Sequence, residues 1–330
     1  MRTGDLVAGR YRLVEPLGAG GLSRVWLAWD KEAGLTVAIK QGALPEGIDP
    51  AEADQFRDLT VREARAFSRV SHPHLVRTMA VIPAAEAPWI VMEYVPARSL
   101  QQIIDEDGPL SPERAARLGR CVLAALAAVH RAGLLHLDVK PSNVLIADDG
   151  RVKLADFSPA VTAEAVRELA RAGIVFGSPK YLAPERLAEG EGGPESDLWS
   201  LGATLYHAVE GRPPFDRPTI TDILRALGED PPDPMQHAGP LLPVLKGLLR
   251  RDPAARPSAA EVEADLRAIV LPEPAGRRLS LRPSPARRRL ALAVAAFVAL
   301  MALLTVATSA RPHPAPDPGP APAGTTLPGR

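Results

Sequence analysis

The sequence predicts an α+β fold, in which a strand-rich N-terminal part of the chain precedes a larger and mostly helical part. Short runs of β-branched and aromatic residues fall within residues 11–92, whereas longer runs with helical spacing of apolar residues fall within residues 99–270. A sharp change of composition near residue 271 ends the part that is expected to fold.

Strands are predicted in the N-terminal part where a run rich in strand-forming residues is bounded by turn residues. The predicted strands are Tyr11–Val14, Arg24–Ala28, Thr36–Lys40 and Trp89–Met92. One helix is predicted between them at about residues 51–68, because its polar and charged residues are interrupted by apolar ones. Those apolar residues are Phe56, Leu59, Val61 and Phe67.

The helical part contains runs in which apolar residues recur at three- and four-residue spacing. These runs predict helices at residues 112–132, 197–211, 241–250 and 258–270. Cys121 is the only cysteine and lies in the first of them, which excludes an intrachain disulfide framework and a cysteine-based zinc cluster. We interpret it as a core residue, because a free cysteine packs as a small hydrophobic side chain.

The charge of the chain is balanced, with 39 basic and 39 acidic residues among 330. A balanced charge provides no global attraction toward nucleic acid, so no nucleic-acid partner is expected. Any partner must be recognised by a local feature of the chain.

Residues 136–185 carry polar side chains in the order and spacing that phosphoryl transfer from ATP requires. Asp138 can accept the proton of a substrate hydroxyl, and Lys140 can neutralise the transferring phosphate. Asn143 and Asp156 supply the oxygen ligands that magnesium prefers. Asp138 alone would also suit a surface turn, but Lys140 and Asn143 follow it at two and five residues and argue against that interpretation.

The segments His136–Asn143, Asp156–Phe157 and Ala183–Glu185 resemble motifs of the eukaryotic-like (Hanks-type) protein kinase superfamily. The short connections are most similar to those of the bacterial membrane-anchored Ser/Thr kinases. Lys140 followed by Pro141 resembles Ser/Thr kinases rather than tyrosine kinases, and Ser178 takes the place of the residue that bridges the catalytic Asp and Lys in Ser/Thr kinases.

The resemblance implies a bilobal protein kinase fold within residues 1–270. A strand-rich N-lobe is expected at about residues 11–95 and a helical C-lobe at about residues 96–270. It also implies ATP as cosubstrate, with Mg²⁺ or in its place Mn²⁺, and proteins with Ser or Thr hydroxyls as substrates. Autophosphorylation is expected as well, and a homodimer is left open.

The resemblance places the phosphates of ATP at a glycine-rich hairpin, where glycine lets the backbone approach phosphate oxygens. Ser23 stands where the family has its third glycine. Lys40 closes the third-strand motif Val37–Lys40 and is expected to contact the α and β phosphates, held there by an ion pair with Glu63. The full set of residues expected to bind ATP is Leu17, Gly18, Ala19, Gly20, Gly21, Leu22, Ser23, Val25, Ala38, Lys40, Met92, Glu93, Val95 and Leu145.

Within this set, the resemblance implies which residues contact each part of the adenine ring. Val25, Ala38 and Leu145 are expected to contact the faces of the ring, with Met92 at the back of the pocket. The backbone groups of Glu93 and Val95 are expected to meet its edge.

Three charged residues are expected to be structural. The resemblance pairs Glu185 with Arg256, and it places Asp197 below the catalytic loop as an anchor. Since a buried carboxylate without a partner is costly, substituting any of them should destabilise the helical lobe.

The chain departs from the family at two places that bear on regulation. Leu137 stands where most regulated kinases have an arginine that binds a phosphorylated activation loop, and leucine cannot bind phosphate. Ser158 replaces the glycine after Asp156-Phe157, and Pro159 restricts it further. The activation loop, residues 159–182, contains only Thr162 and Ser178 as serine or threonine residues. Kinase activity is therefore expected to be largely constitutive.

The C-terminal part predicts a membrane anchor. Residues 271–289 form a linker rich in Pro and Arg, with six arginines against the single acid Glu273. Residues 290–310 follow as twenty-one residues without a charge, which suffices to cross a hydrocarbon core. A buried core helix is the alternative, but it would stand between two Pro-rich segments with nothing to pack against.

Orientation follows from the arginines, which concentrate on the cytoplasmic side of spanning helices. They precede the span, whereas only Arg311 follows it directly, so a single-pass protein of the cell membrane with a cytoplasmic kinase domain is expected. Residues 311–330 contain seven prolines and should form a disordered extracytoplasmic tail.

Two other functions remain as alternatives. A membrane-tethered pseudokinase scaffold that binds nucleotide is motivated by Leu137 and Ser158. The intact set of Lys40, Glu63, Asp138, Asn143 and Asp156 argues for an active enzyme instead. A small-molecule kinase on the same fold is the weaker alternative, because residues 177–185 resemble a platform for a peptide substrate.

Overall fold

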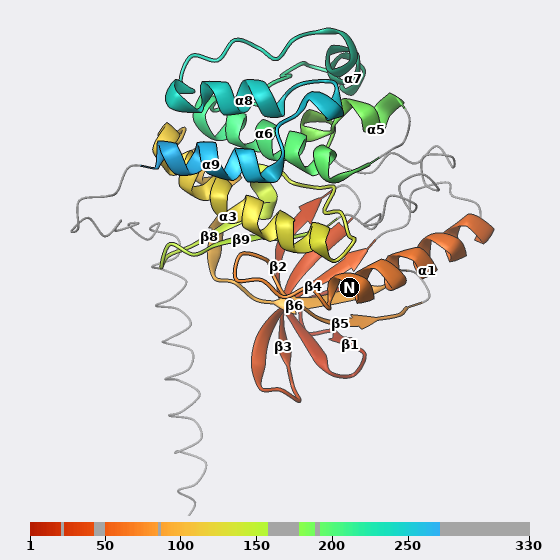
Figure 1. Cartoon of the computed structure of the whole chain (residues 1–330). Coiled ribbons are helices and arrows are strands. Elements are labelled where there is room, and N and C mark those ends of the chain that lie inside the picture. Colours follow the sequence, from red (N-terminus) through yellow and green to blue (C-terminus); the bar gives the residue numbers. More distant parts are fainter. Residues whose placement is uncertain (21–22, 43–49, 85–86, 158–177, 189–191, 271–330) are drawn as a thin grey trace, which may run out of the picture. The chain divides into compact units, whose positions relative to one another are not determined.

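The computed structural model describes residues 1–20, 23–42, 50–84, 87–157, 178–188 and 192–270. These residues belong to one compact unit, Met1–Arg278. Strands gather in its N-terminal part and helices in the part that follows, as the sequence predicts (Figure 1). This is the order of a strand-rich part and a helical part that was expected from the sequence.

The N-terminal part is built on a six-stranded antiparallel sheet with the strand order β1-β2-β3-β4-β6-β5. The strands are β1 (Leu6–Val7), β2 (Tyr11–Gly20), β3 (Ser23–Asp30), β4 (Leu35–Gly42), β5 (Thr78–Ile82) and β6 (Trp89–Glu93). Four of them contain the predicted runs. Strands β1 and β5 were not predicted, because β1 has only two residues and burial does not alternate along β5.

The two faces of this sheet bury different side chains, because successive residues of a strand point to opposite faces. One face carries a small apolar cluster that includes Trp26, Val37, Ile39 and Val91. The other face carries Ala38, Ile90 and Met92, which belong to the large core shared with the helices. Two of the residues expected to contact adenine, Ala38 and Met92, lie on this second face.

Helix α1 (Pro50–Phe67) matches the helix predicted at residues 51–68. It contacts β5 and lies beside the sheet in Figure 1. Ala64 and Phe67 are fully buried in the large core, whereas Arg62 is exposed. The last turn therefore places an apolar face against the core and a charged face outward.

The helical part contains seven helices among the described residues. They are α2 (Leu100–Asp107), α3 (Pro112–Arg131), α5 (Pro184–Ala188), α6 (Pro194–Glu210), α7 (Ile220–Glu229), α8 (Leu242–Leu248) and α9 (Ala259–Ile269). The four predicted helices correspond to α3, α6, α8 and α9. Ser111 caps α3 through a hydrogen bond to the Arg114 N–H, with Pro112 at its first position.

Helix α6 forms the centre of the helical part, with every residue from Ser196 to Val209 buried. Helices α3 and α8 pack against it (Figure 1). The approach of α8 depends on Gly202, because a Cβ there would lie 2.7 Å from the Leu248 Cβ. Cys121 on α3 is partly buried against the same core, in agreement with its prediction as a core residue.

A second, three-stranded sheet lies in the predicted helical region and was not expected from the sequence. It pairs β7 (Ala97–Ser99), β8 (Val144–Ala147) and β9 (Val152–Leu154). The Val76 N–H donates to the Leu154 carbonyl at 2.8 Å, which ties β9 to the segment after α1. The residues expected to hold metal, Asn143 and Asp156, lie just before β8 and just after β9.

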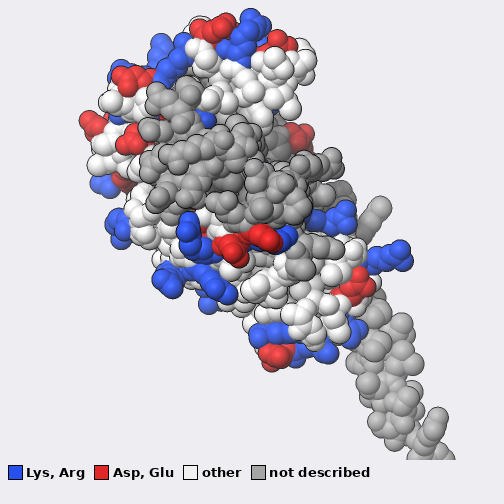
Figure 2. All heavy atoms as spheres, turned by 90° about the vertical axis from the view of Figure 1, so that its right-hand side faces the viewer, with Lys and Arg blue, Asp and Glu red and all other residues white. Residues whose placement is uncertain are grey.

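Acidic and basic side chains are interspersed over the described surface on the face shown in Figure 2. Arg10 illustrates the local pairing, with its Nη2 2.6 Å from the Asp30 Oδ2.

The predicted linker, membrane span and tail, residues 271–330, lie outside the described residues. Among the residues that the structure describes, no helix is both long and apolar enough to cross a membrane.

Candidate active site

The loop that carries Asp138 is anchored from below by Asp197, which is fully buried near the start of α6. Its Oδ1 accepts the Leu137 N–H at 2.7 Å, and its Oδ2 accepts the His136 N–H at 2.9 Å. The Nε2 of His130 lies 2.7 Å from the same Oδ2. Burial raises the pKa of Asp197, but these hydrogen bonds outweigh it and hold the pKa below its usual value. The prediction of an anchoring Asp197 is confirmed.

Asp138, Lys140 and Ser178 form a compact polar network. The Lys140 Nζ lies 2.8 Å from the Asp138 Oδ2 and donates to the Ser178 Oγ at 2.8 Å. The Ser178 hydroxyl lies 3.5 Å from the Asp138 Oδ1. Ser178 thus bridges the two groups as predicted, and it fixes both at the place where a substrate hydroxyl would enter.

Asn143 connects Asp138 to Asp156. Its Nδ2 donates to the Asp138 carbonyl at 2.8 Å, to the Asp138 Oδ2 at 2.9 Å and to the Asp156 carbonyl at 3.3 Å. Since only the amide NH₂ can donate to these oxygens, the Oδ1 of Asn143 is left for another partner. Asp156 adopts a left-handed backbone with φ of 57°, a conformation that Asp tolerates better than most residues.

The donor set fits magnesium or manganese. A carboxylate from Asp156 and an amide oxygen from Asn143 are the hard oxygen ligands that these ions take, with phosphate oxygens and water completing the shell. Among the described residues, no group of three or more His, Cys, Asp or Glu side chains forms a separate metal site.

Lys40 lies on β4 with its Nζ 3.5 Å from the Asp156 Oδ1. Glu63 is 2% exposed on α1, and the Arg62 Nε lies 3.4 Å from its Oε1. The ion pair found for Lys40 among the described residues is thus the one with Asp156, and its expected pair with Glu63 stays a prediction.

The residues expected to contact the adenine ring lie on one face of the large sheet or pack against the same core. Cross-strand pairing sets Val25 opposite Lys40 and Ala38 opposite Met92. Residues directly opposite each other on paired strands lie on the same face of a sheet, and so do residues two apart on one strand. The side chains of Val25, Ala38, Lys40 and Met92 therefore lie on the same face of the large sheet. Leu145 on β8 and Val95 belong to the side chains that pack on the core containing Ala38 and Met92.

The Glu93 backbone donates its N–H to the Arg77 carbonyl at 2.9 Å. Only its carbonyl could therefore meet an adenine edge. Its side chain is also engaged, because the Lys153 Nζ lies 2.7 Å from the Oε1. Glu93 is thus held firmly on β6 next to Met92.

The glycine-rich segment forms a hairpin tip, as predicted. Gly18 pairs with Val25, Ala19 with Arg24 and Gly20 with Ser23 across β2 and β3. A Cβ on Gly18 would meet nothing within 4 Å, so this side of the strand is open. Leu17 is 44% exposed beside it, while Gly21 and Leu22 lie outside the described residues.

Glu185 and Arg256 form the predicted ion pair, with two contacts of 2.7 Å. The Ser196 hydroxyl donates to the Glu185 Oε1 at 2.6 Å, and the Arg256 guanidinium lies 5.1 Å over the ring of Trp199. Burial raises the pKa of Glu185, but the bonds from Arg256 and Ser196 outweigh it and lower the pKa below its usual value. The pair ties α5 to α6 and to the segment before α9.

Two features of the site were missed from the sequence. Phe157 stacks on Phe67 with ring centroids 4.1 Å apart, and Phe67 meets His136 edge-on at 6.1 Å. The stack joins α1 to the segments of Asp138 and Asp156. The other missed residue is Arg186, which donates from its Nη1 to the Leu137 carbonyl at 3.0 Å. An arginine directly after Ala183-Pro184-Glu185 was the signal that could have indicated it.

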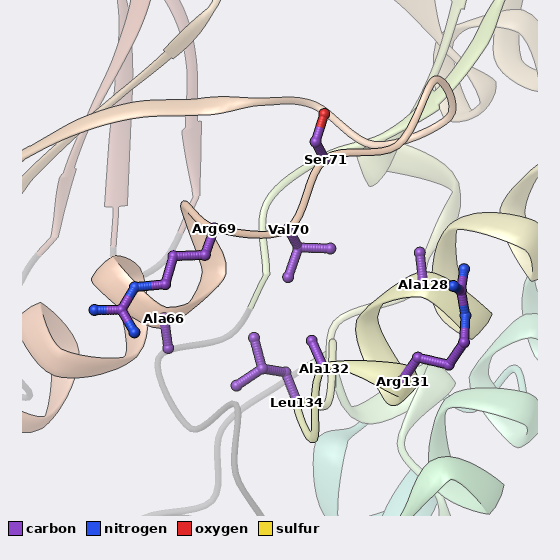
Figure 3. A pocket seen from close by; sticks show the side chains of 8 residues that line it. All are labelled: Ala66, Arg69, Val70, Ser71, Ala128, Arg131, Ala132 and Leu134. Atoms are coloured by element: carbon purple, nitrogen blue, oxygen red, sulfur yellow. The ribbon is translucent and has the colours of Figure 1, made fainter.

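A separate hollow of about 430 Å³ lies between the end of α1 and the end of α3. Val70 and Leu134 form its apolar floor, with Arg69 and Arg131 on opposite sides (Figure 3). None of the residues predicted to bind nucleotide or to catalyse line it.

Ser158, where the chain departs from the family, lies outside the described residues, as do Pro159 and Thr162.

The carboxylate of Asp138 thus lies beside a lysine and a hydroxyl, with Asn143 and Asp156 next to it, an arrangement that suits phosphoryl transfer. The chain belongs to the protein kinase family, because the family model described as "Protein kinase domain" matches residues 11–265. The expected superfamily is therefore confirmed.

Several curated relatives carry the same kind of domain. The chain is 35% identical over 269 residues to "Serine/threonine-protein kinase pkn2" of Myxococcus xanthus, which covers 78% of this chain and 32% of that protein. It is 35% identical over 258 residues to "Probable serine/threonine-protein kinase PkwA" of Thermomonospora curvata, covering 78% and 34%. It is 34% identical over 278 residues to "Serine/threonine-protein kinase PknB" of Mycolicibacterium smegmatis, covering 81% and 44%. The chain thus spans less than half the length of these relatives.

Proposed function

We propose that this chain transfers the γ-phosphate of ATP to serine and threonine hydroxyls of proteins, its own included. The observation that carries the proposal is the network of Asp138, Lys140, Ser178 and Asn143, in which every polar contact is 3.5 Å or shorter. Asp138 accepts the proton of the substrate hydroxyl, and the Lys140 ammonium neutralises charge on the transferring phosphoryl group. The names of the relatives support serine and threonine as acceptors.

A bound Mg²⁺ or Mn²⁺ would neutralise charge on the phosphates. Asn143 and Asp156 are the residues that would hold it, and Asn143 also fixes Asp138, so one side chain couples metal binding to the position of the base. Lys40 lies on the sheet face with Val25, Ala38 and Met92 and would contact the phosphates of a nucleotide on that face.

The test is Asp138→Asn in the full chain, assayed with labelled ATP, Mg²⁺ and a generic protein substrate. Removing the proton acceptor should lower the transfer rate by about 10²- to 10⁴-fold, the usual contribution of general-base catalysis. Nucleotide binding should stay within about twofold of wild type. Full transfer by the variant would contradict the role of Asp138.

A nucleotide-binding pseudokinase scaffold is the second candidate, motivated by Leu137 and Ser158, where the chain departs from the family. The same assay decides between them. Nucleotide binding by the wild type without transfer to any protein, with either Mg²⁺ or Mn²⁺, would support the scaffold.

We also propose that residues 290–310 anchor the chain in the cell membrane, with the kinase domain in the cytoplasm. The support is the uncharged run and the arginines that precede it. In such a membrane, neighbouring copies would meet often enough to phosphorylate one another. Protease added to intact cells should leave the kinase domain uncut, whereas cleavage within residues 1–270 from outside would refute this orientation.

A further inference from the structure

Leu137 holds a backbone conformation that its side chain does not favour. Its φ is +60°, in the left-handed region that glycine, asparagine and aspartate visit more readily than leucine. The side chain is 2% exposed, so the residue cannot relax toward solvent. Such a conformation persists only where the surroundings fix it, and such residues cluster at functional sites.

Two buried charged side chains hold the backbone of Leu137, one through its N–H and the other through its carbonyl. The Leu137 N–H donates to the Asp197 Oδ1 at 2.7 Å, and the Leu137 carbonyl accepts from the Arg186 Nη1 at 3.0 Å. That carbonyl belongs to the peptide group that leads directly into Asp138. Arg186 therefore fixes the plane of the peptide on which the catalytic side chain is mounted.

Arg186 is itself placed firmly. It is 7% exposed on α5, directly after Glu185, whose carboxylate is bonded twice by Arg256. Burial lowers its pKa, and the charges of Asp197, Asp138 and Glu185 oppose that effect. The guanidinium thus stands among three carboxylates, one of them the catalytic base.

Arg186 also lies close to the residues of the candidate site. It lines one narrow gap together with Asp138 and Ser178. Arg186 and Asp197 thus hold the two peptide groups that flank Leu137, one through its carbonyl and the other through its N–H.

We propose that Arg186 is a positioning residue that orients Asp138 by holding the Leu137 carbonyl. The inference rests on the proposed phosphoryl transfer, which it extends by a residue that acts through the backbone. A merely structural arginine would support folding without affecting the rate per folded molecule.

The first test compares Arg186→Met and Arg186→Lys with wild type in the full chain. Met retains length and loses the donor, so kcat per folded molecule should fall at least tenfold while the KM for ATP stays within twofold. Lys restores one donor and should recover part of the rate. The matched control is Arg120→Met, which breaks the pair with Glu263 between α3 and α9 and should leave kcat unchanged. Equal kcat for Arg186→Met and Arg120→Met would overturn the proposal.

A double-variant cycle separates positioning from folding. Glycine adopts the left-handed region freely, so Leu137→Gly should reduce the need for the clamp. Arg186→Met should then cost at least threefold less in kcat on the Leu137→Gly background than on the wild type. Additive losses would contradict action through the Leu137 carbonyl.

Hydrogen exchange tests the proposal without enzymatic activity. In Arg186→Met, or in Arg186→Lys if the first variant does not fold, amides of residues 136–143 should exchange at least tenfold faster, while those of α3 and α6 keep their wild-type rates. Unchanged exchange in residues 136–143 would overturn the proposal. If the wild type transfers no phosphate, the proposed function fails and this measurement alone decides the role of Arg186.

Discussion

At the scale of single residues, the site depends on hydrogen bonds that fix charged groups relative to one another. The Lys140 Nζ contacts both Asp138 and Ser178 at 2.8 Å, so the hydroxyl holds the ammonium beside the carboxylate. A free lysine has several rotamers, and fixing it costs conformational entropy that the hydroxyl helps to offset. Ser178 therefore contributes to the rate without taking part in proton or phosphate transfer.

Ser178→Ala should lower kcat by about tenfold, which corresponds to about 1.4 kcal/mol in the barrier. Ser178→Thr keeps the hydroxyl and should lie within about threefold of wild type. Steady-state kinetics with a generic protein substrate measure both. Ser142→Ala, at an exposed position two residues after Lys140, is the control and should leave kcat unchanged. Equal rates for Ser178→Ala and wild type would show that Lys140 is held without the hydroxyl.

The residue pairs also show what the sequence could establish. Glu185 with Arg256, and Asp197 with the backbone of the loop, follow from motif positions and are formed in the structure. The pair of Lys40 with Glu63 stays a prediction, because its contact depends on how the end of α1 sits against β4. Motif spacing along the chain does not determine that placement.

At the scale of elements, the long periodic helices were predictable and the short strands were not. The runs behind α3 and α6 extend over several turns, so their apolar spacing is clear. Strands β7, β8 and β9 have three or four residues each, and β7 pairs with β8, which lies far from it in the sequence. Burial on both sides removes the alternation that would indicate β9, in which all three residues are buried.

The packing of α8 on α6 provides an element-scale prediction. A Cβ at position 202 would lie 2.7 Å from the Leu248 Cβ and 3.4 Å from the Leu249 Cδ2. Gly202→Ala should therefore force α8 away and lower the free energy of unfolding by about 1–3 kcal/mol, as overpacked cores do. Chemical denaturation of the full chain, monitored by circular dichroism, measures it.

The matched control is Gly228→Ala on α7, where an added Cβ meets nothing within 4 Å. Alanine is a better helix former than glycine, so this variant should gain about 0.5–1 kcal/mol. The two substitutions make the same chemical change and should shift stability in opposite directions. If Gly202→Ala is as stable as wild type, the contact between α6 and α8 is looser than the structure shows.

At the scale of the whole molecule, burial of titratable groups links the core to pH. His136 is fully buried, His207 is 6% exposed and His72 is partly buried, and burial lowers the pKa of all three below the usual 6.5. Around His207, the charges of Asp105 and Asp216 and a backbone hydrogen bond with Gly211 raise its pKa, whereas the charge of Lys180 lowers it. Its Nδ1 lies 2.7 Å from the Tyr181 hydroxyl.

The direction of the pH dependence follows from these shifts. The histidines of the unfolded chain bind protons as the pH falls through about 6.5, whereas the buried histidines of the folded chain do so only at lower pH. The free energy of unfolding is therefore highest above about pH 6.5 and declines below it. A second decline should come between about pH 4 and 2, because the hydrogen bonds from Arg10 lower the pKa of Asp30 to about 2. Unfolding by urea at pH 7.5, 6.5 and 5.5 isolates the histidine range from the carboxylate range.

The last prediction assigns part of this slope to one side chain. His207→Gln removes the titrating group and keeps a polar partner for Tyr181, so stability should fall less steeply between pH 7.5 and 5.5, by at most about 1.4 kcal/mol per pH unit for one proton. The exposed His237→Gln should follow the wild-type profile. Since α6 carries His207 and also the anchor Asp197, loss of the folded helix on acidification should release the loop of Asp138 as well, and transfer activity should decline together with the folded fraction. A wild-type slope in His207→Gln would show that the pH dependence arises elsewhere, with His136 the next residue to test.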